Sequence, residues 1–137
     1  MPKFAVTGIK ERKITPVEDK QARSKNMIVD FQHIEESILP NFKGGEKSYA
    51  AKMFFDGKCR IMKGRLIPGA SIGLHTHEGN CEIIFMRKGI GTVLFDGETL
   101  TLNEGEVHYC PMGHTHSLTN NTASDIEFDA VVAEQNL

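Results

Sequence analysis

From residue 48 almost to its end, the chain alternates between short apolar runs and turn residues. Runs rich in β-branched and aromatic residues and bounded by Gly, Asp, Asn or Pro indicate strands joined by tight turns. The pairs Asp56-Gly57 and Asp96-Gly97 each separate two such runs and predict two-residue hairpins, because both positions tolerate a positive φ. We expect strands at 49–55, 60–67, 72–77, 82–87, 92–95, 99–102, 106–110, 116–119 and 126–132.

The first part of the chain has a different pattern. Residues 1–26 carry many charges and few apolar positions, which predicts an N-terminal arm with one short strand at 4–6. Residues 31–39 could make one or two helical turns before Pro40 ends them. No long helix is expected among the later strands, so the pattern predicts an all-β sandwich or barrel at 27–137, preceded by the arm.

Length and composition restrict the class of protein. A chain of 137 residues with 39% hydrophobic and 25% charged residues is typical of one globular domain. A formal net charge of -2 argues against nucleic acid as a partner. We expect no membrane segment and no secretory signal. Three cysteines, an odd number without metal-like spacing, favour reduced thiols and a cytoplasmic location.

Four side chains carry the candidate chemistry. On a strand at 72–77, period-two geometry places His75 and His77 on one face, where two imidazoles can reach one ion. Glu82 begins the following strand and could return beside them, and His116 follows a later bend. Three imidazoles and a carboxylate suit one divalent transition metal ion (Fe, Mn, Ni, Cu or Zn) and do not suit calcium or magnesium. Four protein ligands would leave positions for water or substrate.

The two segments around these residues resemble the paired signature motifs of the cupin superfamily. The first motif, G-x5-H-x-H-x4-E-x6-G, begins at Gly69, and the second, G-x5-P-x-G-x2-H-x3-N, begins at Gly105. The resemblance implies a double-stranded β-helix, or jelly-roll barrel, with the metal inside it. It also implies the metal ligands. These are His75, His77, Glu82 and His116.

The resemblance leaves the reaction open, because cupin barrels serve several chemistries. The leading hypothesis is a small metal-dependent enzyme, of dioxygenase, isomerase or lyase type, that acts on a small oxygen-bearing organic molecule. His114, His108 and Tyr109 are candidate acid/base groups, and which of His108 and Tyr109 faces the cavity is undecided. The alternatives are a non-catalytic module that binds or senses a small ligand, and a purely structural metal site.

The arm also suggests a partner. As arms do in many cupin-like barrels, residues 1–26 could add to a neighbouring subunit, which predicts a homodimer.

Overall fold

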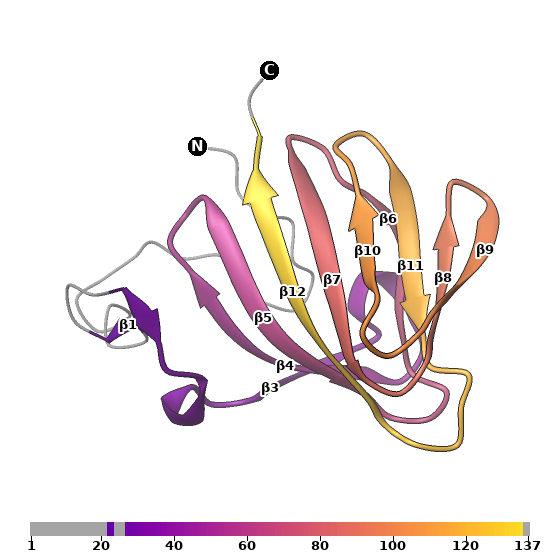
Figure 1. The fold of residues 1–137 in the computed structure, drawn as a ribbon, viewed down its shortest axis with the longest axis horizontal. Coiled ribbons are helices and arrows are strands. Elements are labelled where there is room, and N and C mark those ends of the chain that lie inside the picture. Colours follow the sequence, from indigo (N-terminus) through magenta and orange to yellow (C-terminus); the bar gives the residue numbers. More distant parts are fainter. Residues whose placement is uncertain (1–21, 24–26, 136–137) are drawn as a thin grey trace.

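The computed structural model describes residues 22–23 and 27–135, and the described chain is all-β, as the sequence predicted (Figure 1). The first elements are short: strands β1 (Ala22–Arg23) and β2 (Ile28–Val29) pair with each other, and two 3₁₀ turns, η3 (Phe31–His33) and η4 (Phe42–Gly44), flank strand β3 (Ser37–Pro40). The remaining strands are β4 (Ser48–Phe55), β5 (Cys59–Leu66), β6 (Ser71–Thr76), β7 (Asn80–Lys88), β8 (Gly91–Phe95), β9 (Glu98–Leu102), β10 (Val107–Cys110), β11 (Thr115–Thr119) and β12 (Ile126–Glu134).

These strands form two antiparallel sheets that enclose a common interior (Figure 1). The larger sheet has the order β10-β7-β12-β5-β4-β3, and the smaller has the order β6-β11-β8-β9. Ile84 and Phe128 of the larger sheet belong to the same buried cluster as Val93 and Leu118 of the smaller one. The two sheets therefore share one hydrophobic core, which is the jelly-roll arrangement that the sequence predicted.

The two Asp-Gly pairs give different turns. Asp96 and Gly97 have φ values of 47° and 84° and join β8 directly to β9, as a two-residue hairpin requires. β4 and β5 pair as expected, but their turn lies at Gly57-Lys58, one residue later than predicted, because the Asp56 N–H donates to the Cys59 carbonyl oxygen at 3.3 Å. There the Asp56 carboxylate accepts hydrogen bonds from the backbone N–H groups of Lys58 and Cys59 at 2.9 and 2.8 Å. This side-chain cap stabilises the shifted turn.

The structure corrects the helical prediction at 31–39. Only η3 turns there, and Ser37–Pro40 pairs along β4 as an edge strand. Pro40 is the last strand residue, a position where the missing N–H costs no central ladder bond. The predicted arm, 1–26, and its strand at 4–6 lie outside the described residues except for Ala22–Arg23.

The backbones of η4 and β6 approach each other closely next to the front of the barrel interior. η4 packs against β6 through Gly45 and Gly73. A Cβ atom on Gly73 would lie 2.1 Å from the carbonyl oxygen of Lys43, and one on Gly45 would lie 2.1 Å from that of Ser71. Glycine at both positions therefore allows η4 to lie beside the strand that carries His75.

Candidate metal centre

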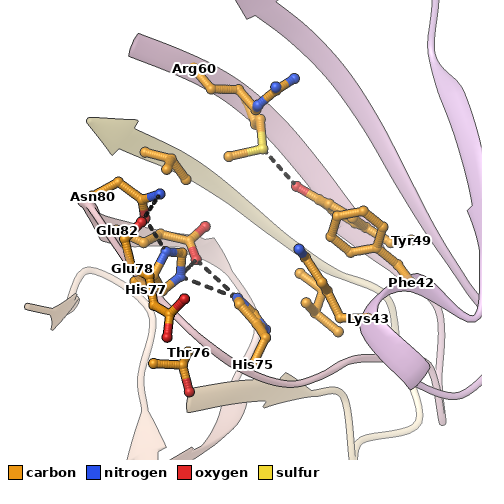
Figure 2. Close-up of a pocket in the computed structure, with 13 residues that line it drawn as sticks. Phe42, Lys43, Tyr49, Arg60, His75, Thr76, His77, Glu78, Asn80 and Glu82 are labelled. Atoms are coloured by element: carbon orange, nitrogen blue, oxygen red, sulfur yellow. Dashed lines mark hydrogen bonds and ion pairs between the residues drawn. The ribbon is translucent and has the colours of Figure 1, made fainter. Parts of the chain in front are cut away.

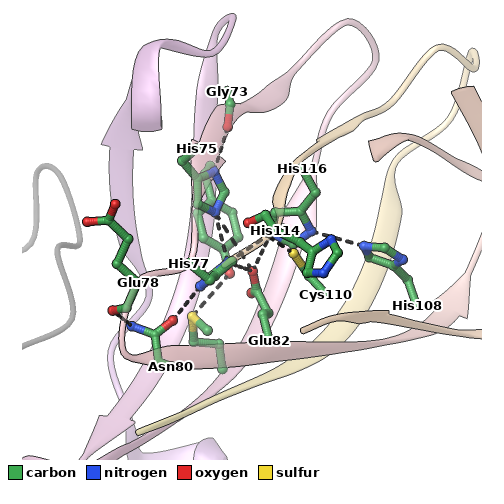
Figure 3. Close-up of polar contacts among 12 residues, drawn as sticks. Gly73, His75, His77, Glu78, Asn80, Glu82, His108, Cys110, His114 and His116 are labelled. Atoms are coloured by element: carbon green, nitrogen blue, oxygen red, sulfur yellow. Dashed lines mark hydrogen bonds and ion pairs between the residues drawn. The ribbon is translucent and has the colours of Figure 1, made fainter. Parts of the chain in front are cut away.

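His75, His77, Glu82 and His116 converge in the interior and form what we call the metal cluster (Figure 3). His75 lies on β6, His77 directly after it, Glu82 on β7 and His116 on β11. The pairing of His116 with His75 brings the second motif against the first. The four candidate ligand atoms all lie within 4.8 Å of one another, so the cluster could hold a metal ion.

The separations between the ligand atoms fit a single ion. His77 Nε2 lies 3.2 Å from His75 Nε2, 2.9 Å from His116 Nε2 and 3.0 Å from Glu82 Oε1. Glu82 Oε1 lies 2.9 Å from His116 Nε2 and 3.9 Å from His75 Nε2. Two ligands at right angles, each about 2.1 Å from an ion, are about 3.0 Å apart. Most of the measured separations match this value.

The Nδ1 atom of each histidine in the metal cluster also has a hydrogen-bond partner. His75 Nδ1 donates to the carbonyl oxygen of Gly73 at 2.7 Å, and His77 Nδ1 donates to Asn80 Oδ1 at 2.5 Å. Because these oxygens can only accept, each Nε2 has a lone pair directed into the cluster once its own hydrogen gives way to a metal. His116 Nδ1 lies 3.0 Å from Nε2 of His108. Such outer contacts orient metal-binding imidazoles.

The protonation states also suit a cation. Burial works to raise the pKa of Glu82, but hydrogen bonds with His116, His75 and His77 outweigh it and hold the pKa well below its usual value. Burial lowers the pKa of His116, although Glu82 opposes this, and burial together with His116 lowers the pKa of His108 to about 4. An ionised carboxylate beside neutral imidazoles is the form in which these groups bind metals.

A cavity of about 240 Å³, the front pocket, opens onto the metal cluster (Figure 2). His75, His77 and Glu82 lie along one wall, and Lys43 and Tyr49 lie across from them (Figure 2). Burial and the charge of Glu82 raise the pKa of Tyr49, so its hydroxyl stays protonated and can donate a hydrogen bond. Arg60, Phe42, Met62, Ile72, Thr76, Glu78, Asn80 and Val132 complete the lining.

The three candidate acid/base residues occupy different places. Tyr109 is half exposed on β10, on the face opposite to His108 and Cys110, and His108 lies behind His116. His114 contacts Asp96 through its Nδ1 and stacks on Phe95 with ring centroids 5.4 Å apart. None of the three lines the front pocket within the described part of the chain. Their role in catalysis stays a prediction.

Other predicted features have structural roles. Asn120, the last residue of the second motif, is fully buried and donates to the carbonyl oxygens of Leu66 and Ser124 at 2.9 and 2.8 Å. Cys81 and Cys110 are buried, as expected for thiols that pack in the core. Burial, followed by Glu82, raises the pKa of Cys110 to about 12, so this thiol is unreactive.

Sequence reasoning missed four residues of the site. Asn80 is the first residue of β7, and only the structure shows its bond to His77. Lys43, Tyr49 and Arg60 come from η4, β4 and β5, outside both motifs. Arg60 is only 2% exposed, and its guanidinium lies 4.2 Å from the ring centroid of Phe55. The available signal was alternation, because Arg60 shares the strand face of Met62 and Leu66, where arginine is almost never found unless it is paired.

The fold and the metal cluster define a small jelly-roll protein with a candidate metal site inside its barrel. Comparison with known proteins agrees: the cupin domain family matches residues 62–132, and the chain belongs to that family. The oxalate-binding protein of Thermotoga maritima is 31% identical over 112 residues, which is 77% of this chain and 93% of that protein.

Solved structures support the same fold. A crystal structure from Thermotoga maritima, described as a predicted oxalate decarboxylase, has a TM-score of 0.73 and 30% identity, and the match covers 79% of this chain and 99% of that one. A sugar phosphate isomerase of the cupin superfamily from Silicibacter pomeroyi has a TM-score of 0.65 and 21% identity, with 77% and 74% covered. Among the described residues, no helix is long and apolar enough to cross a membrane.

Proposed function

We propose that this chain binds one divalent transition metal ion in the metal cluster and captures a small carboxylate in the front pocket, with oxalate as the first candidate. The proposal rests on the arrangement of the front pocket, which has candidate metal ligands on one wall and basic side chains elsewhere in its lining. Candidate metal ligands face the cationic side chain of Lys43 across a cavity of about 240 Å³, and Arg60 lies in the same lining. Metal, lysine and arginine all attract an anion with several oxygens.

The residues of the front pocket have complementary tasks in this proposal. A bound metal would act as a Lewis acid toward carboxylate oxygens. Arg60 and Lys43 would neutralise the ligand, and the Tyr49 hydroxyl, which donates to Met62 Sδ at 3.6 Å in the structure, would turn to donate to one of the ligand oxygens. The apolar side chains of Met62, Ile72 and Val132 would limit water in the pocket, which strengthens these interactions.

The similarity to the oxalate-binding protein of Thermotoga maritima supports the choice of ligand. It also favours the non-catalytic reading of the sequence, in which the barrel binds or senses a small molecule. The presence of a pocket beside the metal cluster argues against a purely structural metal site, which would need a closed shell.

Titration calorimetry of the manganese-loaded protein with oxalate tests the proposal. We expect saturable binding that is lost without metal and is weakened at least about tenfold by Arg60→Met, which keeps an unbranched apolar side chain and removes the charge. Arg87→Met, on the outside of the larger sheet, is the matched control and should bind normally. Equal binding by the metal-free protein, or an unchanged affinity in Arg60→Met, would contradict the proposal.

Turnover is the second candidate function, and the similarity to a structure described as a predicted oxalate decarboxylase favours it. Incubation of the metal-loaded protein with oxalate, followed by measurement of formate and carbon dioxide, distinguishes an enzyme from a binding module. If product forms, single substitutions of His108, Tyr109 and His114 test their predicted acid/base roles. A stable bound oxalate without product would favour the binding module.

The predicted homodimer has its own test. Deletion of residues 2–26 should convert a dimer into a monomer if the arm joins two subunits. Solution mass measured by light scattering gives the answer, and an unchanged dimer would contradict the role of the arm.

A further inference from the structure

A second cavity lies beyond the metal cluster, on the side away from the front pocket. This rear cavity has a volume of about 400 Å³ and is bordered by β8, β9 and β10. Its walls combine four aliphatic side chains with a threonine, a histidine and a carboxylate. The side chains used below are Val93, Leu100, Leu102, Val107, Glu106 and His108.

His108 is the link between the rear cavity and the metal cluster. It lines the rear cavity, is only 7% exposed and places Nε2 3.0 Å from Nδ1 of His116. Figure 3 shows His108 on the far side of His116 from His75 and His77. His116 is the only member of the metal cluster that does not line the front pocket in the described part of the chain. The two cavities therefore approach the cluster from opposite sides.

The positions of the hydrogens follow from the contacts. When Nε2 of His116 offers its lone pair to the cluster, the hydrogen of the neutral ring must be on Nδ1. That hydrogen is donated to Nε2 of His108, so the hydrogen of the neutral His108 ring is on its own Nδ1. Within the described residues, Nδ1 of His108 has no hydrogen-bond acceptor from the protein. Among the described residues this nitrogen is not one of the sealed unpaired atoms, so a water or a ligand in the rear cavity can accept its hydrogen.

We propose that the rear cavity binds a small neutral molecule with an apolar body and one hydrogen-bond acceptor, and that its occupancy is transmitted to the metal cluster through His108 and His116. The aliphatic walls of Val93 and Leu100 favour the apolar body. Glu106 in the lining disfavours an anion. The rear cavity thus selects the opposite chemistry to the cationic front pocket. This inference rests on the metal site of the proposed function and not on its carboxylate ligand.

Transmission has a simple physical cause. An acceptor that binds the Nδ1–H of His108 makes Nε2 of His108 a stronger acceptor, because hydrogen bonds in a chain polarise one another. His116 then donates more strongly and becomes a better metal ligand through its own Nε2. By linkage, the metal must tighten the rear ligand by the same factor as the rear ligand tightens the metal.

Cyclohexanone is a suitable probe, with methylenecyclohexane as the control of the same shape that lacks the oxygen. Methyl NMR of Val93 and Leu100 should show saturable shifts with the ketone in the metal-free and the Co²⁺-loaded protein. Saturating ketone should lower the Co²⁺ dissociation constant about fivefold, the low end of typical coupling between two sites, and should change the visible spectrum of Co²⁺. The hydrocarbon should leave both unchanged.

Two variants separate the proposed path from direct binding of the ketone to the metal. Leu100→Phe fills the rear cavity and should abolish both effects of the ketone while Co²⁺ affinity without ketone stays the same. His108→Phe removes the acceptor of His116 and should cost tenfold to a hundredfold in Co²⁺ affinity, with partial rescue in His108→Gln. The nitrogen shifts of the Zn²⁺-loaded protein should show the hydrogen of His108 on Nδ1.

Several results would overturn the inference. These are no saturable methyl shifts with ketone, unchanged Co²⁺ affinity at saturating ketone, a ketone effect that persists in Leu100→Phe, or a hydrogen on Nε2 of His108. Failure of Co²⁺ uptake would overturn the coupling together with the proposed metal site. Normal Co²⁺ uptake without oxalate binding would overturn only the carboxylate ligand of the front pocket.

Discussion

Two carboxylates of the larger sheet, Glu82 and Asp129, have opposite surroundings. Glu82 lies inside, 7% exposed, and meets three imidazoles. Asp129 lies on the outside and accepts from Arg87 Nε at 2.7 Å and from Lys63 Nζ at 3.1 Å. We call these last three residues the outer ion cluster. Both carboxyl groups have a lowered pKa.

The difference lies in what neutralises each charge. Arg87 and Lys63 carry permanent or nearly permanent positive charge, so the negative charge of Asp129 is compensated without a ligand. The imidazoles around Glu82 can give up their Nε2 hydrogens and then direct lone pairs into the cluster, and such a group is completed by a cation. Partner identity, and not the carboxylate itself, therefore separates a structural ion pair from a candidate metal site.

The largest predicted effect comes from the double variant His75→Ala, His116→Ala. Loss of two of four ligands should abolish metal binding, because the remaining pair cannot compete with water. Elemental analysis of protein purified without chelator or affinity metal measures it. Asp129→Asn, in the outer ion cluster, is the control and should keep a near-stoichiometric transition metal. Equal metal content in the wild type, the double variant and Asp129→Asn would show that the metal does not bind at the metal cluster, and would contradict the contrast between Glu82 and Asp129.

The second prediction concerns thermal stability. Free metal at a hundredfold excess over its dissociation constant should stabilise the native protein by about 2.7 kcal/mol, which raises the melting temperature by roughly 10 °C. Scanning calorimetry with and without Mn²⁺ measures the shift. The double variant should show none, whereas Asp129→Asn should show the full shift. A shift that survives in the double variant would place the ion elsewhere.

Local sequence patterns were sufficient for most strands and for the shared face of His75 and His77, because period-two alternation is a local property. The resemblance to the paired cupin motifs added Glu82 and His116. The orientation of His108 and Tyr109 was not readable, since it depends on the pairing of Cys110 with Glu82 across β10 and β7. That pairing turns His108 and Cys110 inward with Glu82. Strand register over such a separation is set by tertiary packing.

The remaining errors have similar causes. Local propensity suggested helical turns at 31–39, but pairing of Ser37–Pro40 with β4 outweighs it, and Ile34 packs against Phe54. Arg60 and Tyr49 enter the front pocket from strands that carry no motif. Only the closed barrel brings them to the metal cluster.

The third prediction weakens the metal cluster without removing a ligand. Asn80→Ala removes the acceptor of His77 Nδ1 and leaves the ring free to rotate. Metal affinity should fall tenfold to a hundredfold, as is usual when an outer partner of a metal-binding histidine is lost. Asn80→Asp keeps an acceptor and should recover most of the affinity in calorimetric titration with Co²⁺. If alanine and aspartate give equal affinities, the bond from His77 to Asn80 does not hold the ring.

The smallest predicted effect concerns the outer ion cluster and its dependence on pH. Partial burial works to raise the pKa of Asp129, but hydrogen bonds from Arg87 and Lys63 outweigh it, and the pKa lies below its ordinary value of 3.8. A carboxyl group with a lowered pKa in the folded state stabilises the protein above the unfolded value and loses this contribution as pH falls through the folded value. Asp129→Asn should therefore cost about 0.5–1 kcal/mol at neutral pH, because Arg87 and Lys63 are largely exposed.

Urea unfolding of the metal-free wild type and Asp129→Asn, between neutral pH and the lowest pH at which both proteins fold, measures this difference. The two free energies of unfolding should converge as pH falls below 3.8, since protonation removes the charge that the substitution removes. A difference that stays constant over this range would assign the effect of the substitution to packing. In that case Asp129 would stabilise the fold by packing and not by its charge, and the electrostatic contrast with Glu82 would not hold.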